Sequence, residues 1–224
     1  MPTPDPTWFE RDPLALAPLL LGGVLRRTDA SGAVALRVTE VEAYRGSDDP
    51  GAHTFRGKTA RNATMFGPGG HVYCYFTYGM HHAVNIVAGP EGSGWGVLVR
   101  AGEVVEGTSL ARERRSARRA SAPTGELARG PGNVAQALGA TLADDGAALL
   151  DAPSPGHRAA PETHIEMTPL WSFEPAAEPP RHRTGPRVGV SGPGGDASAY
   201  PWRFWLPGEP SVSAYRAAVA RRRA

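Results

Sequence analysis

Residues 34–44 read VALRVTEVEAY, a run in which β-branched and other apolar residues alternate with polar ones. An apolar–polar period of two is typical of a β-strand with one buried face. On such a strand, three aliphatic residues and two glutamates share one face: Val34, Leu36, Val38, Glu40 and Glu42. The turn-forming sequence GSDDPG follows almost directly and ends the strand.

The two glutamates are the first candidates for chemistry. A carboxylate on an apolar face is costly unless it is paired, exposed at the strand end or used in a reaction. A general base is the functional interpretation. The structural alternative is an ion pair with an arginine nearby in the fold, and three arginines are candidates: Arg37, Arg45 and Arg100.

Three extended runs follow downstream, at 71–79 (HVYCYFTYG), 82–88 (HAVNIVA) and 95–105 (WGVLVRAGEVV). Only a few residues around Met80 separate the first two runs, which predicts a tight antiparallel hairpin with Tyr78 close to its tip. Shorter strands are expected near the C-terminus, at 163–168, 187–192 and 201–206.

Helices are expected over 14–25, 109–120 and 133–139. Residues 152–186 are rich in Pro and Gly and predict a loop-rich segment, and flexible tails are expected at 1–11 and 217–224. The sequence contains no internal repeat and no clear domain break. We therefore expect a single α+β domain spanning residues 1–224.

Composition narrows the class of protein. The chain has 224 residues, 41% of them hydrophobic, and one cysteine, Cys74, which excludes an intramolecular disulfide framework and fits a reducing compartment. Apolar runs stay short of the 18 residues that a membrane span needs, so we expect a cytoplasmic protein. The histidines near Cys74 lack the spacing of zinc ligands, so neither a metal nor another cofactor is expected.

The basic residues are almost all arginine. The net charge is only +2, with 23 Arg and a single lysine, Lys58, and arginines cluster at 112–119. Such a cluster either meets phosphates, which guanidinium groups bind bidentately, or decorates a solvated helix. The composition alone does not establish nucleic-acid binding.

A set of flat side chains with polar tips provides a second candidate site. Its members are Tyr44, Tyr73, Tyr75, Phe76 and Tyr78, with His53 and Asn85. Aromatic faces hold a purine by stacking, while His and Asn can contact its edges. The alternative is that these aromatic side chains are ordinary core residues. A tyrosine beside a hairpin turn is harder to bury and suits a wedge.

Several of these motifs occur together in one order: EAY, AH, RN, MF, YGM, Asn85 and LVRA, continued by ARGPGNVAQALG, RVGVSG and PWRFWLPG. In this combination the chain, from about residue 12 to 213, resembles the 3-methyladenine (alkyladenine, methylpurine) DNA glycosylases of animals and bacteria. The resemblance implies a mixed α/β domain around a curved antiparallel sheet. It also implies a protruding β-hairpin that inserts into the minor groove of damaged double-stranded DNA.

The same resemblance implies roles for individual residues. Glu42 resembles the general base that activates a water molecule, and Arg100 a residue that helps to hold this water, with a backbone carbonyl near Val190. Tyr78 resembles the wedge that fills the gap left by the extruded nucleotide. The base pocket is implied by four residues: Tyr44, His53, Tyr75 and Asn85. Asn85 resembles the residue that crowds the 2-amino group of normal guanine.

The expected activity is monofunctional hydrolysis of the N-glycosidic bond of alkylated purines by a monomer. 3-Methyladenine and 7-methylguanine are the expected lesions, with hypoxanthine and ethenoadenine as further candidates. One rival is a glycosylase with lyase activity, which needs an amine nucleophile such as Lys58 or, if Met1 is removed, the secondary amine of Pro2. A second rival is a lesion-recognition module without catalysis. Ala83 and His82 replace larger residues of many relatives, which leaves the lesion range open.

Overall fold

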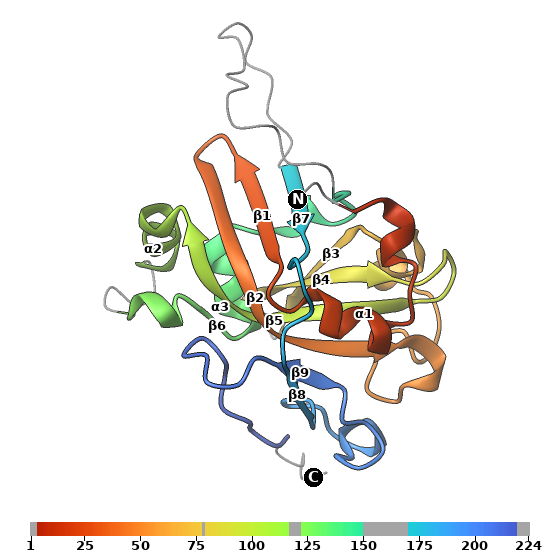
Figure 1. Cartoon of the computed structure of the whole chain (residues 1–224). Coiled ribbons are helices and arrows are strands. Elements are labelled where there is room, and N and C mark those ends of the chain that lie inside the picture. The colour runs from red at the N-terminus through yellow and green to blue at the C-terminus, as the bar shows by residue number, and fades with distance from the viewer. Residues whose placement is uncertain (1–3, 78, 117–121, 150–169, 219–224) are drawn as a thin grey trace, which may run out of the picture.

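The fold centres on a nine-stranded sheet, seen in a computed structural model that describes residues 4–77, 79–116, 122–149 and 170–218 (Figure 1). The main path runs β3-β4-β5-β2-β1-β7, and its neighbouring strands pair antiparallel. Helices and 3-10 turns surround the sheet. The predicted α+β class with an antiparallel sheet is confirmed.

Four of the strands follow the predicted runs closely: β2 (Gly32–Arg45), β3 (Val72–Thr77), β4 (His81–Ala88) and β5 (Trp95–Glu106). β3 and β4 form the expected hairpin, with Val72 opposite Ile86 and Thr77 opposite His81. The turn residue Tyr78 lies outside the described residues. β2 and β5 are the longest strands and lie side by side in the middle of the sheet.

The prediction that the aliphatic residues and the two glutamates of β2 share one face is wrong. Val38 and Val41 belong to the same hydrophobic core although three positions separate them, which an unbroken alternation would not allow. Register shifts occur on both sides of Glu40 in the pairing with β5 and switch the face that points to the core. As a result, Glu40 and Glu42 face away from the aliphatic residues and toward Arg100.

Helix α1 (Pro13–Leu20) is shorter than the expected helix over 14–25. Asp12 caps its N-terminus by accepting a hydrogen bond from the backbone N–H of Leu14 at 2.9 Å. The chain then turns at Gly22, which has φ of +76°, and Val24–Asp29 forms β1 between β2 and β7. Leucines on both sides of this turn are buried, so the apolar run in the sequence continues past the end of the helix.

Helices α2 (Thr108–Ser116) and α3 (Pro131–Leu138) confirm the other two predicted helices within the described residues. The arginines of α2 do not form a solvated face. Arg114 donates to Asp29 at 2.9 Å, and the buried Arg115 donates to Asn133 and Gln136 of α3. These arginines therefore tie α2 to its neighbours.

The C-terminal part contains more regular structure than its Pro and Gly content suggests. Within the segment expected to be loop-rich, β7 (Leu170–Glu174) buries Trp171 and Phe173, and β8 (Arg183–Gly185) pairs with β9 (Arg203–Trp205). β9 in turn pairs with β2, which returns the chain to the middle of the sheet (Figure 1). The expected strand over 201–206 is confirmed.

The structure differs from the expectations for the other short C-terminal strands and for the N-terminal segment. Residues 187–192 form a turn and no strand, while the strand expected at 163–168 lies outside the described residues. At the N-terminus, Pro6–Phe9 forms a 3-10 turn (η1) whose Phe9 packs against Phe173, so the chain is part of the packed structure from residue 6 onward. The remaining short strand is β6 (Ala128–Arg129). The other 3-10 helices of the described residues are η2 (Gly46–Asp48), η3 (Ala60–Phe66), η4 (Thr124–Glu126), η5 (Leu142–Asp144) and η6 (Pro193–Gly195).

A helix able to cross a membrane would need a long apolar run, and the helices of the described residues include none.

Candidate active site

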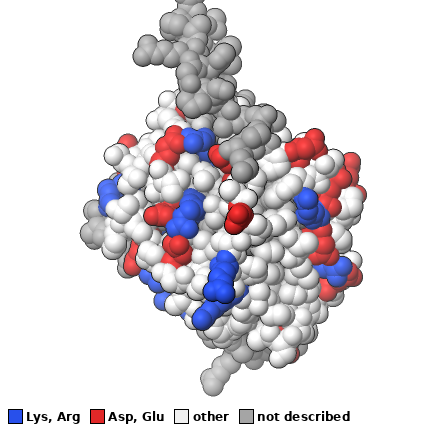
Figure 2. Space-filling model, in the orientation of Figure 1, with Lys and Arg blue, Asp and Glu red and all other residues white. Residues whose placement is uncertain are grey.

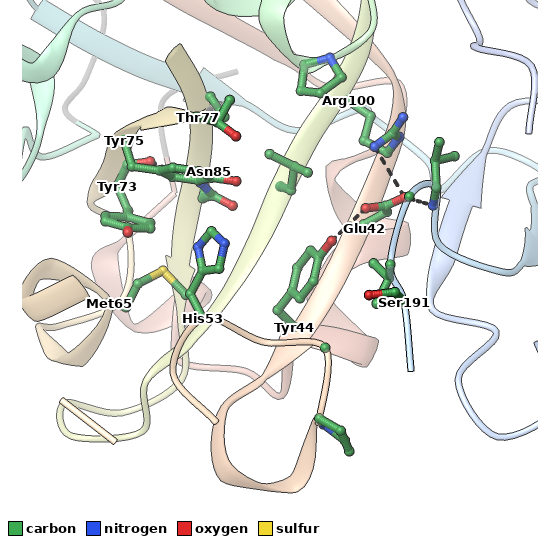
Figure 3. A pocket seen from close by; sticks show the side chains of 18 of the residues that line it. Glu42, Tyr44, His53, Met65, Tyr73, Tyr75, Thr77, Asn85, Arg100 and Ser191 are labelled. Atoms are coloured by element: carbon green, nitrogen blue, oxygen red, sulfur yellow. Dashed lines mark hydrogen bonds and ion pairs between the residues drawn. The ribbon is translucent and has the colours of Figure 1, made fainter. Parts of the chain in front are cut away.

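A cavity of about 680 Å³ opens between the strands β2 to β5 and the turn at 188–191. All predicted site residues that the structure describes line this cavity: Glu42, Tyr44, His53, Tyr75, Asn85 and Arg100. Figure 3 shows Glu42, Tyr44 and Arg100 on one side, with the side chains of Tyr73, Tyr75 and Asn85 across the space. The predicted wedge, Tyr78, is outside the described residues.

Glu42 is fully buried and its carboxylate is held on both oxygens. Oε1 accepts the backbone N–H of Val188 at 2.7 Å and lies 3.3 Å from Nη1 of Arg100. Oε2 accepts the hydroxyl of Tyr44 at 2.8 Å. These donors keep the carboxylate directed at the cavity in a defined orientation (Figure 3).

Tyr44 is both a wall of the cavity and a hydrogen-bond donor to the glutamate. Burial, followed by the negative charge of Glu42, raises the pKa of its hydroxyl well above the ordinary value. The hydroxyl therefore stays protonated at neutral pH and continues to donate. The aromatic ring remains available to stack on a flat ligand.

The opposite wall is made of aromatic side chains from β3. Tyr73 and Tyr75 stack with ring centroids 5.3 Å apart, and His53 meets the ring of Tyr75 edge-on at 4.8 Å. Desolvation, followed by the positive charge of Arg61, lowers the pKa of His53, although this side chain keeps an exposed edge. A neutral imidazole beside a tyrosine face suits the edge of a heterocyclic base.

Two asparagines fix the geometry of this wall. Asn85, on β4, is buried and donates from Nδ2 to the backbone carbonyl of Tyr73 at 3.2 Å. Asn62 donates to the carbonyls of His53 and Gly57, each at 3.1 Å, and so holds the loop that carries His53. The RN motif of the sequence thus has a structural role at the cavity.

Glu40 fits the ion-pair interpretation of the sequence. It is fully buried and pairs with Arg100 at 2.9 Å and with Arg203 at 2.7 Å. Of the other two candidate arginines, Arg37 pairs with Glu103 and Glu209, and Arg45 pairs with Asp12. Arg100 alone reaches both glutamates of β2.

A second buried ion pair, between Asp49 and Arg187, lies behind the cavity and was not predicted from the sequence. The guanidinium of Arg187 also donates to the carbonyls of Ala43 and Gly194, at 3.0 and 2.8 Å, and lies 4.5 Å from the centre of the Tyr44 ring. Both residues occur in motifs that stood out, GSDDPG and RVGVSG. The turn residues of GSDDPG suggested a loop, and nothing in the sequence marked Asp49 as buried.

The rim at 188–191 is packed tightly against the loop after β2. A Cβ at Gly194 would lie 2.3 Å from the backbone nitrogen of Gly51, and a Cβ at Gly195 would lie 2.2 Å from the carbonyl oxygen of Val190. Only glycine permits these approaches. Val190, which the resemblance singled out, thus lines the cavity in a fixed position.

The structure also shows where other candidate groups lie. Lys58 lies 6.0 Å from the ring centre of Phe66 and is not among the residues that line the cavity, and Pro2 is outside the described residues. In the described part of the chain, groups of three or more His, Cys, Asp or Glu able to hold a metal are absent. On the face shown in Figure 2, basic and acidic side chains are interspersed.

Comparisons with known proteins identify the family of the chain. The family model for methylpurine-DNA glycosylase matches residues 7–210. A protein of Streptomyces avermitilis is 51% identical over 216 residues, 96% of this chain and 93% of the relative, and one of Leifsonia xyli subsp. xyli is 51% identical over 212 residues, 93% of this chain and 90% of the relative. Both carry the name "Putative 3-methyladenine DNA glycosylase". The chain therefore belongs to the methylpurine-DNA glycosylase family, a family of DNA glycosylases.

Proposed function

We propose that this protein is a monofunctional glycosylase that releases alkylated purines, 3-methyladenine and 7-methylguanine first, from double-stranded DNA. The observation that carries the proposal is the buried carboxylate of Glu42, which faces a cavity walled by tyrosines and is held by Tyr44, Val188 and Arg100. The relatives' names and the family support DNA and methylated purines as the substrate class.

In the proposed reaction, Glu42 accepts a proton from a water molecule that attacks C1′ of the extruded nucleotide. The purine leaves through an oxocarbenium-like state, and a nearby carboxylate offsets the positive charge that develops on the sugar. Arg100 and a backbone carbonyl near Val190 help to hold the water. The products are the free base and an abasic site.

The walls of the cavity account for lesion choice in this proposal. A cationic alkylated purine stacks well between the electron-rich rings of Tyr44 and Tyr75, and it needs little acid catalysis to leave. Asn85 crowds the 2-amino group of normal guanine, and Tyr78 fills the space that the flipped nucleotide leaves in the duplex. Neutral lesions such as hypoxanthine need protonation, and no residue is assigned to that step.

We further propose that the protein acts as a monomer in the cytoplasm and needs no cofactor. The lyase alternative requires an amine near C1′, and the position of Lys58 outside the cavity lining speaks against it. Borohydride trapping on lesion-containing duplex tests this point. A covalent protein–DNA adduct would replace the monofunctional proposal with a lyase.

The decisive experiment compares wild type with Glu42→Gln under single-turnover conditions on duplexes that carry one lesion each. The amide keeps the shape of the side chain but cannot act as a base, so we expect excision to fall by at least 10²-fold while lesion binding persists. Glu103→Gln, on the neighbouring strand β5 in an exposed pair with Arg37, is the matched control. Unchanged excision by Glu42→Gln would refute the assigned role.

A further inference from the structure

We propose that Glu40 is a positioning residue that divides the charge of Arg100 between two carboxylates and thereby keeps Glu42 basic. This inference rests on the proposed role of Glu42. Glu40 lies two residues before Glu42 on β2 and does not line the cavity. It therefore acts, in this proposal, only through Arg100.

The contacts of Glu40 form a closed set from three parts of the chain. Oε1 accepts Nε of Arg100 from β5 at 2.9 Å and Nε of Arg203 from β9 at 2.7 Å. Oε2 accepts the backbone N–H of Ser213 at 2.8 Å, and the Ser213 hydroxyl is within 3.0 Å of both oxygens. All lone pairs of this buried carboxylate thus have donors, which fixes its orientation against Arg100 and Arg203.

Arg100 bridges the two glutamates through different nitrogens. Its Nε donates to Glu40, whereas its Nη1 lies 3.3 Å from Glu42, a longer and weaker contact. Burial lowers the pKa of Arg100, but Glu42 and Glu40 together outweigh that effect and raise it. The guanidinium is therefore a permanent charge that both carboxylates share, and the tighter bond goes to Glu40.

The other charged groups around Glu42 leave this balance intact. Two buried cations, Arg100 and Arg203, match the two glutamates. Arg187, behind Tyr44, also interacts electrostatically with Glu42, but it is ion-paired with Asp49, so Glu40→Gln leaves its contribution unchanged. A full ion pair between Arg100 and Glu42 would stabilise the carboxylate and make it a poorer base. With Glu40 in place, Arg100 can orient Glu42 without neutralising it.

A purely structural role for Glu40 is the alternative, because removing one member of a buried ion pair destabilises a protein. The two roles differ in the pH profile of excision. Loss of stability would lower the amount of folded enzyme and could move the acid limb only to higher pH, where a less stable protein already unfolds. Loss of the negative charge beside Arg100 would leave Glu42 ionised at lower pH, and so the acid limb of the profile would move to lower pH.

The test is the single-turnover rate against pH for wild type, Glu40→Gln and the control Glu103→Gln, on the lesion that wild type excises fastest. For Glu40→Gln we expect a roughly tenfold slower plateau, with the acid limb shifted down by about one pH unit. Lesion binding should remain within a few-fold of wild type. Glu103→Gln should match wild type, since Glu103 pairs with Arg37 at the surface.

Ser213→Ala provides a second variant that retains every charge. Loss of the hydroxyl leaves the charge of Glu40 less compensated, and the greater negative potential at Glu42 should shift the acid limb upward by a fraction of a pH unit. Opposite shifts in the two variants support the proposal. If Glu40→Gln does not fold, the Ser213→Ala shift decides the matter, provided that circular dichroism shows this variant folded across the acid limb. An unmoved acid limb in the folded variants overturns it.

Failure of this inference is distinguishable from failure of the proposed function. If Glu42→Gln abolishes excision while Glu40→Gln behaves like Glu103→Gln, the function stands and the role of Glu40 is refuted. If wild type binds lesions but releases no base from any of them, the proposed function itself is refuted and the inference with it.

Discussion

At the residue scale, the ring and the hydroxyl group of Tyr44 make different contacts. Its ring forms one wall of the cavity, and its hydroxyl donates to Oε2 of Glu42 at 2.8 Å. Because the pKa of this hydroxyl is raised by burial and by Glu42, the donor is present throughout the neutral pH range. Removing the hydroxyl oxygen therefore tests the orientation of Glu42 separately from stacking of the Tyr44 ring on a nucleobase.

For Tyr44→Phe we expect excision to slow by roughly tenfold to a hundredfold, because a hydrogen bond to a charged group contributes about 1.5–3 kcal/mol. Flipping should be nearly unchanged, since the aromatic ring remains. The measurement pairs single-turnover excision with the fluorescence of 2-aminopurine placed next to the lesion. A loss of the flipping signal together with the rate would show that the hydroxyl serves base binding rather than orientation of Glu42.

At the scale of elements, the site is assembled from segments far apart in the sequence. β2 provides Glu42 and Tyr44, β5 provides Arg100, and the turn after Arg187 provides the N–H of Val188. Arg187 joins these parts, because it binds the carbonyl of Ala43 on β2, Asp49 in the following loop and Gly194 in the turn. The Asp49–Arg187 pair therefore anchors the turn whose Val188 N–H binds Glu42.

Asp49→Ala tests this anchor. The change leaves a buried guanidinium without its carboxylate, and we expect the free energy of unfolding to fall by roughly 3–5 kcal/mol, as for other broken buried pairs. Excision should also slow at temperatures where the variant stays folded, because the turn carrying Val188 loosens. Urea denaturation and single-turnover kinetics provide the two readouts.

The neighbouring Asp48→Ala is the control for that experiment. Asp48 is 63% exposed and its oxygen lies 3.9 Å from Arg45, so its removal should change stability by less than about 1 kcal/mol. Equal destabilisation by both changes would mean that the loop itself, rather than the ion pair with Arg187, sets the stability.

The central strands could be predicted from the sequence because alternation and turn residues mark them directly. β1 could not, since Leu21 and Leu25 are buried on either side of Gly22 and give a continuous apolar run. The turn at 187–192 looked like a strand because Val188 and Val190 alternate with other residues. They are apolar because they line the cavity, not because they pack on a sheet.

In the site, likewise, the sequence motifs indicated the residues themselves but not their contacts with distant parts of the chain. The motifs that carry the family resemblance led to the residues that line the cavity. The partners of the buried glutamates remained hidden, because Arg203 and Ser213 reach Glu40 only after the chain returns through β9. The bulge that turns Glu40 toward Arg100 is likewise set by pairing between strands, which the residues of β2 alone do not specify.

At the scale of the whole molecule, the low net charge bears on how the protein is expected to bind undamaged DNA. The net charge is +2. Several arginines form ion pairs within the fold, with Asp29, Asp49, Glu40 and Asp144. Basic and acidic side chains are interspersed on the face in Figure 2. We therefore expect recognition to depend on the cavity more than on a broad basic surface.

This expectation predicts a modest dependence of binding on salt. If the complex makes about four phosphate contacts, affinity for a lesion duplex should fall roughly 100-fold between 50 and 200 mM salt, whereas a protein with a large basic surface loses more. The single-turnover rate at saturating enzyme should stay nearly constant over that range, because the reacting groups are buried and little screened. Fluorescence anisotropy and excision at several salt concentrations measure the two quantities. A rate at saturation that falls as steeply as the affinity would mean that surface contacts, and not only the buried glutamate and its donors, take part in the rate-limiting step.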